Sequence, residues 1–217
     1  MTHPVSDIAS VFLAVAEALR AHADELNRLD AEAGDGDLGV TATNIAAAIT
    51  RALSSSEAEN LAKLLRSCGT AIAREAPSTA GTLLASGLLG AGRRVAEDPS
   101  EGADALAELL GAASGAIAAR GGAEPGSRTM LDALAPAARA ARETASSGGS
   151  ALEVLEAAAA AADTGTKATV TMPPRFGRAA WIPERAAGHE DAGARLVAIV
   201  LASAAMAARD VRVNEQG

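Results

Sequence analysis

Apolar side chains recur at helical spacing from the start of the chain onward. Between residues 6 and 29 they fall three, four or seven positions apart, in one stripe formed by Ile8, Val11, Phe12, Val15, Leu19, Leu26 and Leu29. This spacing places them on one face of an α-helix, with polar residues on the opposite face. The pattern predicts an amphipathic helix over residues 6–29.

The same periodicity returns in seven further segments, each bounded by turn or capping residues. Ser56 with Glu59, and Ser150 with Glu153, have the spacing of capping boxes, in which each side chain bonds the backbone at the other position. Pro136 lies inside a segment that is otherwise helical. The predicted helices span residues 6–29, about 38–53, 59–75, 79–97, 103–120, 128–145, 150–163 and about 192–208.

No comparable pattern predicts a sheet. The one strand-like run, TKATVTM at residues 166–172, is too short and isolated to form one. Short connections between successive helices favour antiparallel neighbours. The fold class expected is therefore all-α, an eight-helix antiparallel up-and-down barrel or bundle, with residues 1–217 in a single domain.

Composition supports helices over sheets and excludes several classes of partner. Apolar residues make up 49% of the chain but aromatic residues only 1%, so the core is built from alanine, leucine, valine and isoleucine, which suits closely packed helices. The net charge is -8 and no dense Lys/Arg run occurs, which argues against a nucleic-acid partner. Cys68 is the only cysteine, so neither an internal disulfide nor a cysteine-rich metal site is expected, and a buried helical thiol is the better interpretation.

The chain gives no sign of membrane insertion. No run reaches the roughly 18 uncharged apolar residues that a membrane span needs. The first residues lack the basic start of a signal peptide and carry acidic residues within their apolar pattern. We therefore expect no membrane association and a cytoplasmic protein.

Residues 164–187 interrupt the helical pattern. They contain Pro173, Pro174, Gly177 and Pro183. Irregular segments of this length in compact domains are usually functional or disordered. Phe176, Trp181 and alternating charges argue against disorder, so a functional segment is expected.

The stretch DAEAGDGDLG, residues 30–39, gathers three aspartates on a glycine-rich turn. Asp30 lies at the end of the first predicted helix, and Asp35 and Asp37 lie two residues apart on the turn. Carboxylates are the oxygen ligands that hard cations such as Mg²⁺ prefer, and a cation would offset the crowding of like charges. An Asx turn that caps the next helix explains the same residues, and the motif alone leaves both interpretations open.

A second candidate is the segment STAGTLL, in which Ser78 and Thr79 stand at a helix start. Free backbone N–H groups there form a natural seat for an anion. A Walker P-loop is excluded, since GxxxxGK[ST] occurs nowhere. Gly87 and Gly90 are better explained by close helix packing, whereas Gly81 stands beside the two hydroxyls and fits a phosphate seat better.

Two further segments carry candidate ligand contacts. In GGAEPGSRTMLDAL, residues 121–134, glycines allow close approach of a ligand and Met130 has the shape to lie against a flat ring. In the segment 175–194, Arg178 and Arg185 have the charge to neutralise phosphate, and surface ion pairs are their alternative. Asp191 with Gly193 opens the last predicted helix.

Taken together and in this order, the four segments resemble the nucleotide-binding L subunit, or L domain, of dihydroxyacetone kinases. The likeness covers about residues 5–208. It rests on Asp30 followed by GDGDLG, on STAGTLL, on GGAEPGSRTMLDALAP and on GRAAWIPERAAGHEDAGA. The last two are the most specific, because family members read like G-x-A-x-x-G-D-[KR]-T-M-x-D-A-L and G-R-A-S-Y-x-G-E-R-S-x-G-H-x-D-P-G-A.

The resemblance implies a helical barrel with Mg-ATP or Mg-ADP bound at one end. It makes Asp30, Asp35 and Asp37 the ligands of two Mg²⁺ ions that bridge the phosphates, and it assigns no catalytic side chain to this chain. The residues that it places around the nucleotide are Leu38, Gly39, Thr41, Ser78, Thr79, Gly81, Gly121, Met130, Arg178, Asp191 and Gly193.

The sequence also departs from the family pattern. Leu38 replaces a histidine, Thr41 an asparagine and Ser127 an aspartate. Pro183 stands where glycine is usual, and Ala192 where proline is usual. The metal carboxylates are retained, which indicates a divergent branch, one that serves a different short ketose, rather than a lost nucleotide site.

The resemblance further implies a partner. In the family, a separate K subunit holds the ketose covalently through a histidine, and this chain shows no K-like region. Three functions follow as alternatives: a subunit that transfers the phosphoryl group of ATP to a short ketose, a subunit whose ADP is recharged by a phosphoryl-carrier protein of the sugar phosphotransferase system, or a non-catalytic nucleotide-binding regulatory module.

Overall fold

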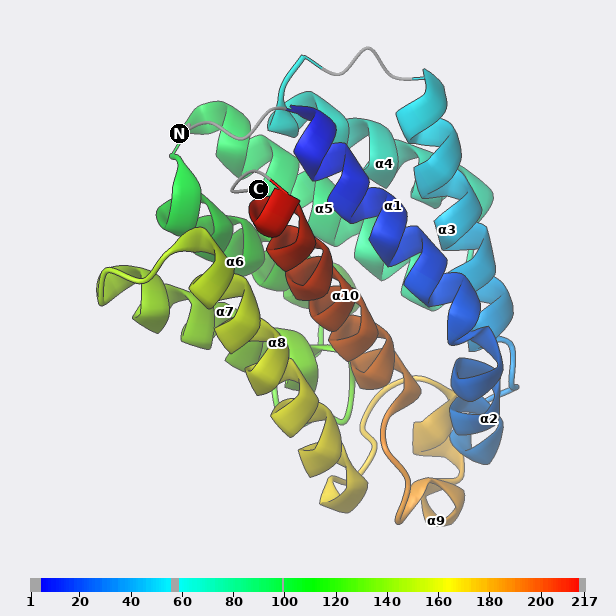
Figure 1. Ribbon diagram of the computed structural model, residues 1–217. Helices are drawn as coiled ribbons and strands as arrows, with labels where there is room; N and C mark the ends of the chain where they lie inside the picture. The colour runs from blue at the N-terminus through cyan, green and yellow to red at the C-terminus, as the bar shows by residue number, and fades with distance from the viewer. Residues whose placement is uncertain (1–4, 56–58, 99, 215–217) are drawn as a thin grey trace.

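The computed structural model describes residues 5–55, 59–98 and 100–214, and this part of the chain is helical with no strand. Ten α-helices and two short 3₁₀ segments follow one another (Figure 1). The first five helices are α1 (Val5–Ala21), α2 (Ala23–Ala33), α3 (Leu38–Ser55), α4 (Leu61–Glu75) and α5 (Thr79–Glu97). The remaining elements are α6 (Gly102–Gly121), α7 (Leu131–Ser146), α8 (Ala151–Ala168), η1 (Thr169–Thr171), η2 (Arg178–Trp181), α9 (Pro183–Ala186) and α10 (Ala192–Asn214).

The all-α class is confirmed, but the count of eight helices is wrong, since the described residues form ten. The helix predicted over residues 6–29 is interrupted at His22, whose Nδ1 lies 2.8 Å from the carbonyl oxygen of Ala18. A side chain that bonds a backbone carbonyl of the preceding turn commonly bends a helix. The other added helix, α9, is a single turn of four residues.

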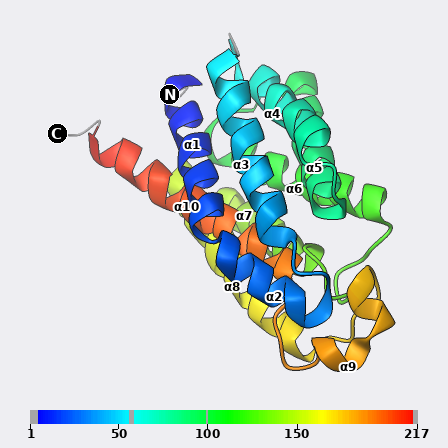
Figure 2. The same ribbon diagram turned by 90° about the vertical axis from the view of Figure 1, so that its right-hand side faces the viewer.

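Each long helix packs against the next one along the chain. α1 contacts α3, and the contacts then run in order through α4, α5, α6, α7 and α8 to α10, which returns to α1. Successive helices run in opposite directions, as Figures 1 and 2 show for α1, α3, α8 and α10. The connections α2–α3, α4–α5, α6–α7 and α8–α10 therefore lie at the same end of the bundle.

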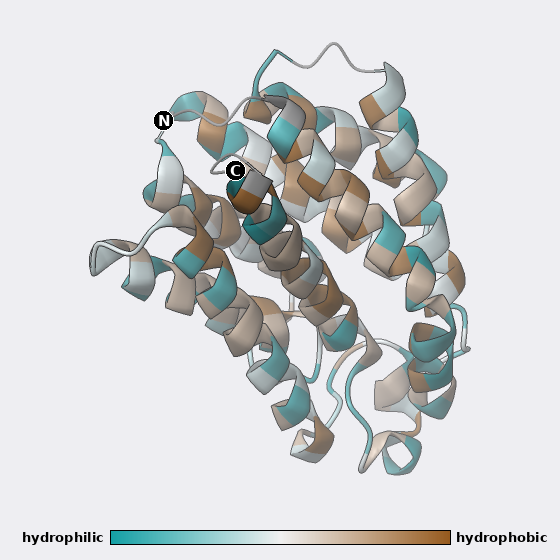
Figure 3. Ribbon diagram, viewed as in Figure 1, coloured by the Kyte–Doolittle hydropathy of each residue, from teal (hydrophilic) through white to brown (hydrophobic). Residues whose placement is uncertain are grey.

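Two hydrophobic clusters fill the interior, and α10 belongs to both. Leu196 and Ile199 pack with α1, α3, α4 and α5, whereas Val197 and Leu201 pack with α6, α7 and α8. Hydrophobic and hydrophilic residues alternate around the helices (Figure 3), as amphipathic helices require. Cys68 is fully buried in the first cluster, which confirms the expected buried thiol, and burial raises its pKa to about 11.

The expected helix boundaries hold at some ends and fail at others. The capping box of Ser150 and Glu153 is present at the start of α8. Ser56 lies outside the described residues, and Asn60 caps α4 by accepting the N–H of Lys63 at 2.9 Å. α8 continues into the strand-like run as far as Ala168 and η1 follows it, so the irregular segment begins later than predicted.

We call residues 169–191, which join α8 to α10, the strap. It holds η1, η2 and α9, so it is more regular than the sequence predicts. Pro183 stands in the first turn of α9, where proline's missing N–H has no partner to lose. Across the described residues, none of the helices combines the length and apolar character that a bilayer crossing needs.

Candidate nucleotide and metal site

All four candidate segments lie in or beside connections at the same end of the bundle. The α2–α3 turn carries the aspartates, and the α4–α5 connection carries Ser78. The α6–α7 loop, residues 122–130, and the strap complete the set. The turn beside α2, the green loop before α7 and the orange strap with α9 gather at the lower end of Figure 1, and α2 and α9 at the lower end of Figure 2. The alternation of helix directions therefore brings together residues that are far apart in the sequence.

The three aspartates form one cluster. Asp30, Asp35 and Asp37 each offer a carboxylate oxygen, and these oxygens lie within 4.8 Å of one another. Asp30 comes from the last turns of α2 and is half-buried, while the other two are exposed. This arrangement suits a hard divalent cation, because all of the ligands are oxygen and two of them face solvent.

Backbone geometry holds the cluster together. Oδ2 of Asp30 accepts the N–H groups of Gly36 at 2.9 Å and of Asp37 at 3.0 Å. Gly36 has φ +78°, a conformation that favours glycine. A Cβ at position 34 would lie 2.3 Å from Oδ1 of Asp30, so a larger residue there would displace this carboxylate from the cluster.

The charges in the cluster are partly offset. Burial raises the pKa of the Asp30 carboxyl, and the negative charge of Asp35 acts in the same direction, against hydrogen bonds from the amides of Asp37 and Gly36. The guanidinium of Arg178, on the strap, forms an ion pair with Asp35. Within the described residues, no backbone N–H donates to the carboxylates of Asp35 or Asp37. A cation site therefore fits these two side chains better than an Asx turn does.

The start of α5 has the expected form of an anion seat. Ser78 caps the helix, and its Oγ accepts the N–H of Gly81 at 3.1 Å. A Cβ on Gly81 would lie 2.0 Å from the carbonyl oxygen of Ala76, so this glycine permits a close chain crossing. Thr79 is exposed. The first N–H groups of the helix remain available to a ligand.

The start of α10 is capped by an aspartate of the strap. Oδ1 of Asp191 accepts the N–H of Ala194 at 2.8 Å, and the N–H of Asp191 donates to Oγ1 of Thr169 at 2.8 Å. Burial raises the pKa of the Asp191 carboxyl to about 6, against the amide of Ala194 and the charge of Arg128. A Cβ on Gly193 would lie 3.6 Å from the Cβ of Met130, so the starts of α7 and α10 are close neighbours.

This carboxyl predicts a pH dependence of stability. Its pKa is about 6 in the folded chain against an ordinary 3.8, so the folded chain binds more protons between about pH 4 and pH 6. The contribution of Asp191 to the stability of the fold is therefore complete below about pH 4 and is lost as the pH rises through 6. Urea unfolding of Asp191→Asn and of the wild type measures this effect. As the pH rises from about 4 to 6, the unfolding free energy of the wild type should fall relative to that of the variant by up to about 1.4 kcal/mol per pH unit. A difference that is independent of pH would contradict this assignment.

Three contacts attach the strap to α2 and to the aspartate turn. Besides the Arg178–Asp35 pair, Nη2 of Arg185 donates to the carbonyl oxygen of Ala31 at 2.7 Å. Nε2 of His189 lies 3.8 Å from Oε2 of Glu32. For Arg178 and Arg185 the sequence left phosphate neutralisation and surface ion pairs open. In the described residues, Arg178 pairs with the aspartate turn and Arg185 bonds the end of α2, and their contact with phosphate stays a prediction.

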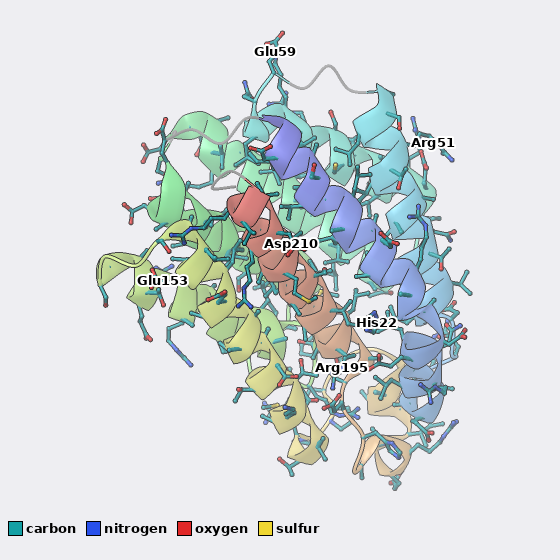
Figure 4. The ribbon with its side chains drawn as sticks, in the orientation of Figure 1. His22, Arg51, Glu59, Glu153, Arg195 and Asp210 are labelled. Carbon is teal, nitrogen blue, oxygen red and sulfur yellow. The ribbon has the colours of Figure 1, made fainter. Side chains whose placement is uncertain are left out.

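At the base of the strap, Arg195 joins three helices. Its Nε donates to Oε2 of Glu190 at 3.0 Å and lies 3.6 Å from Oε1 of Glu25 on α2. Its Nη1 lies 3.6 Å from Oδ1 of Asp163 on α8. Figure 4 labels Arg195 on the lower part of α10, between α8 and α2. These pairs brace the end of the bundle that carries the site.

Several expected nucleotide contacts are turned toward the core. Leu38 is 8% exposed and packs in the first hydrophobic cluster, and Thr41 is also buried. Met130 is 4% exposed and belongs to the second cluster. Gly121 is exposed at the end of α6, where a Cβ would lie 3.2 Å from the side chain of Leu83. Contacts of these four residues with a nucleotide remain predictions.

Sequence reasoning missed two residues, Arg128 of the α6–α7 loop and Asp132 of the first turn of α7. The carboxylate of Asp132 accepts the N–H of Thr129 at 2.8 Å and also the N–H of Gly126. Arg128 is 2% exposed and bonds carbonyl oxygens of the strap. Both lie inside the motif that carries the resemblance, and the signal that could have found them is the family pattern itself, which has Lys or Arg at position 128 and Asp at position 132.

Comparison with known proteins gives a consistent result. Residues 32–206 match the family model described as the DAK2 domain. A D-erythrulose kinase of Mycolicibacterium smegmatis is 34% identical over 194 residues, which cover 88% of this chain and 33% of that enzyme. The ADP-binding subunit DhaL of the PEP-dependent dihydroxyacetone kinase of Escherichia coli is 27% identical over 185 residues, 85% of this chain and 88% of the subunit.

Solved structures agree with these relatives. The native dihydroxyacetone kinase of C. freundii superposes with a TM-score of 0.75 at 27% identity, over 95% of this chain and 35% of the kinase. The same kinase in complex with AMP-PNP and Mg²⁺ gives a TM-score of 0.73. The chain thus spans about a third of the length of the erythrulose and dihydroxyacetone kinases but nearly all of the bacterial ADP-binding subunit.

Proposed function

The chain belongs to the DAK2 domain family, and from this premise we propose that it is the nucleotide- and magnesium-binding subunit of a short-ketose kinase. The observation that carries the proposal is the cluster of Asp30, Asp35 and Asp37 at the end of the bundle where the other three segments meet. A related kinase of similar fold has been solved with AMP-PNP and Mg²⁺. Oxygen ligands on an acidic turn are suited to hold the magnesium of such a nucleotide.

In this proposal each segment has a role in holding Mg-ATP or Mg-ADP. The three carboxylates bind two Mg²⁺ ions, and the N-terminus of α5, with Ser78 and Thr79, receives the phosphates. Arg178 exchanges its ion pair with Asp35 for the nucleotide. Magnesium supplies charge neutralisation on the phosphates, and phosphoryl transfer needs mainly that and accurate positioning. No side chain of this chain is assigned as a nucleophile or general base.

The phosphoryl acceptor is a short ketose held by a separate K-type subunit. The E. coli relative is itself named as one subunit of a kinase, and this chain matches nearly its whole length. The relatives named for D-erythrulose and for dihydroxyacetone act on ketoses of four and three carbons, so the substrate class is a short ketose. A cytoplasmic location goes with this proposal and remains a prediction.

The test is a coupled phosphorylation assay. The purified chain is mixed with a K-type subunit, ATP, magnesium and either dihydroxyacetone or erythrulose, and the phosphorylated ketose is measured. The proposal expects product only when both subunits and magnesium are present. Tight binding of Mg-ADP without any ketose phosphate would instead support the non-catalytic regulatory module.

A second source of phosphoryl groups is favoured by one observation, the name of the E. coli relative, which is PEP-dependent and ADP-binding. In that version the subunit keeps ADP bound, and a phosphoryl-carrier protein recharges it. Exchange of labelled ADP separates the two. ADP that leaves within seconds supports ATP as the donor, and ADP that stays through dialysis supports the carrier protein.

A further inference from the structure

Both ends of the strap bond to one buried side chain, Arg128 of the α6–α7 loop. At the first end, its Nε donates to the carbonyl oxygen of Thr169 at 3.3 Å. At the other end, its Nη2 donates to the carbonyl oxygens of Ala186 at 2.8 Å and His189 at 2.9 Å. One guanidinium thus closes the base of a loop of about twenty residues.

The loop that carries Arg128 is built to hold it in place. Arg128 has φ +60°, which is uncommon for a residue other than glycine. The carboxylate of Asp132 accepts the N–H groups on both sides of it, at Gly126 and Thr129. The adjacent carbonyl oxygen of Ser127 accepts the N–H of Arg175, so the loop bonds the strap at an additional point. Such strain persists only where neighbouring contacts over-determine the conformation.

Arg128 is not explained as an ordinary structural ion pair. It is 2% exposed, and no carboxylate lies in salt-bridge distance of it within the described residues. Its Nη1 is buried without a hydrogen-bond partner there. Burying an arginine costs free energy through the loss of hydration. Because the hydrogen bonds of Arg128 all go to carbonyl oxygens of the strap, we infer that its function is to fix the strap in place.

We propose that Arg128 is the positioning residue of the strap: by bonding Thr169 at one end and Ala186 and His189 at the other, it fixes the loop that presents Arg178 to the aspartate cluster. Closing the base of a flexible loop reduces the conformations that its tip samples. Apart from the bond between the N–H of Arg175 and Ser127, the contacts that attach the rest of the strap in the described residues are partly exposed ones with α2 and with Asp35. The role of Arg128 in nucleotide binding rests on the proposed function, whereas its hydrogen bonds to the two ends of the strap do not.

The test uses three variants of the full chain. Arg128→Met removes every donor while keeping a long apolar stem, and Arg128→Lys keeps the charge but lacks the fork that reaches both ends. Arg175→Met is the matched control, because it removes a positive charge from the strap itself. The side chain of Arg175 is exposed and makes no hydrogen bond or ion pair in the described residues.

Amide hydrogen exchange without nucleotide measures how strongly Arg128 restrains the strap. In Arg128→Met we expect about tenfold faster exchange at the amides of His189 and Asp191, the factor that corresponds to losing one hydrogen bond to a charged group. Arg128→Lys should give about threefold faster exchange on the same basis. Arg175→Met and the core helix α5 should match the wild type. Unchanged strap exchange in a folded Arg128→Met overturns the proposal, and if that variant does not fold, unchanged exchange in Arg128→Lys does so.

Titration calorimetry with Mg-ADP measures whether this restraint affects nucleotide affinity. Arg128→Met should bind about tenfold more weakly, through faster dissociation, with Arg175→Met close to the wild type. Faster strap exchange with unchanged affinity would overturn the positioning role. A wild-type chain that binds no Mg-ADP would overturn the proposed function instead, and the exchange result would still decide whether Arg128 holds the strap.

Discussion

Replacing Asp37 with alanine is expected to reduce magnesium-dependent binding of ADP at least about a hundredfold. The proposed function makes Asp37 a direct ligand of the metal, and even residues that only support metal ligands are worth ten- to a hundredfold in affinity. Asp37 is exposed, and its carboxylate has no backbone donor in the described residues, so folding does not depend on it. Stability without metal should be unchanged or slightly higher, since one of three crowded negative charges is removed. Titration calorimetry and urea unfolding measure the two quantities.

Asp24→Ala is the matched control for this experiment. Asp24 is also an exposed aspartate of α2 but lies outside the cluster. Its loss should leave nucleotide affinity within about twofold, since screened surface charges act weakly at a distance. Equal affinities in Asp37→Ala and the wild type would show that the cluster does not bind the metal.

The second large effect is expected at Gly39, in the first turn of α3. A Cβ there would lie 1.9 Å from the carbonyl oxygen of Ala23 and 2.7 Å from Oδ1 of Asn27, which accepts the N–H of Gly39 at 2.7 Å. Gly39→Ala therefore has to push α3 away from α2. We expect a loss of about 2–3 kcal/mol in unfolding free energy, as for overpacked cores, and weaker magnesium binding, because the aspartates lie on both sides of this contact.

Gly115→Ala is the control for Gly39→Ala. Gly115 is an exposed glycine of α6, and a Cβ there would meet nothing within 4 Å. The substitution should raise stability by about 0.5–1 kcal/mol, since alanine is the better helix former. The two substitutions thus have opposite expected signs in thermal or urea unfolding. Equal stability of Gly39→Ala and the wild type would contradict the close approach of α2 and α3.

The sequence was sufficient to predict the class of fold, and the resemblance to the kinase subunit implied a ligand site at one end of it. Apolar periodicity predicted the long helices, and short connections predicted that successive helices run in opposite directions. Every second connection then lies at the same end, which is why Asp35, Ser78, Met130 and Arg178 all lie at one end of the bundle.

Other features depended on contacts that a single sequence does not contain. The break between α1 and α2 falls at His22, whose side chain contacts the carbonyl oxygen of Ala18, and α8 extends through residues 164–168, where it packs against α10. There, Oγ1 of Thr166 donates to the carbonyl oxygens of Ala162 and Ala194. A run rich in threonine and valine favours a strand locally, and burial against α10 overrides this preference.

The site residues divide in the same way. The carboxylate cluster was predictable because all three aspartates lie within eight residues of chain. The burial of Leu38 was not, because its position in the motif suggested a ligand contact and only the packed helices show that the side chain fills the core. Arg128 was missed because its partners lie 41 to 61 residues away.

Calorimetric titration of ADP into the wild-type chain, once with magnesium and once with a chelator, tests the central claim most directly. The account predicts saturable binding with magnesium and a loss of at least about tenfold in affinity without it, since the carboxylates repel the phosphates unless a cation lies between them. Binding that is equally strong in the chelator, or no binding in either condition, would contradict the assignment of the aspartate cluster as the metal and nucleotide site.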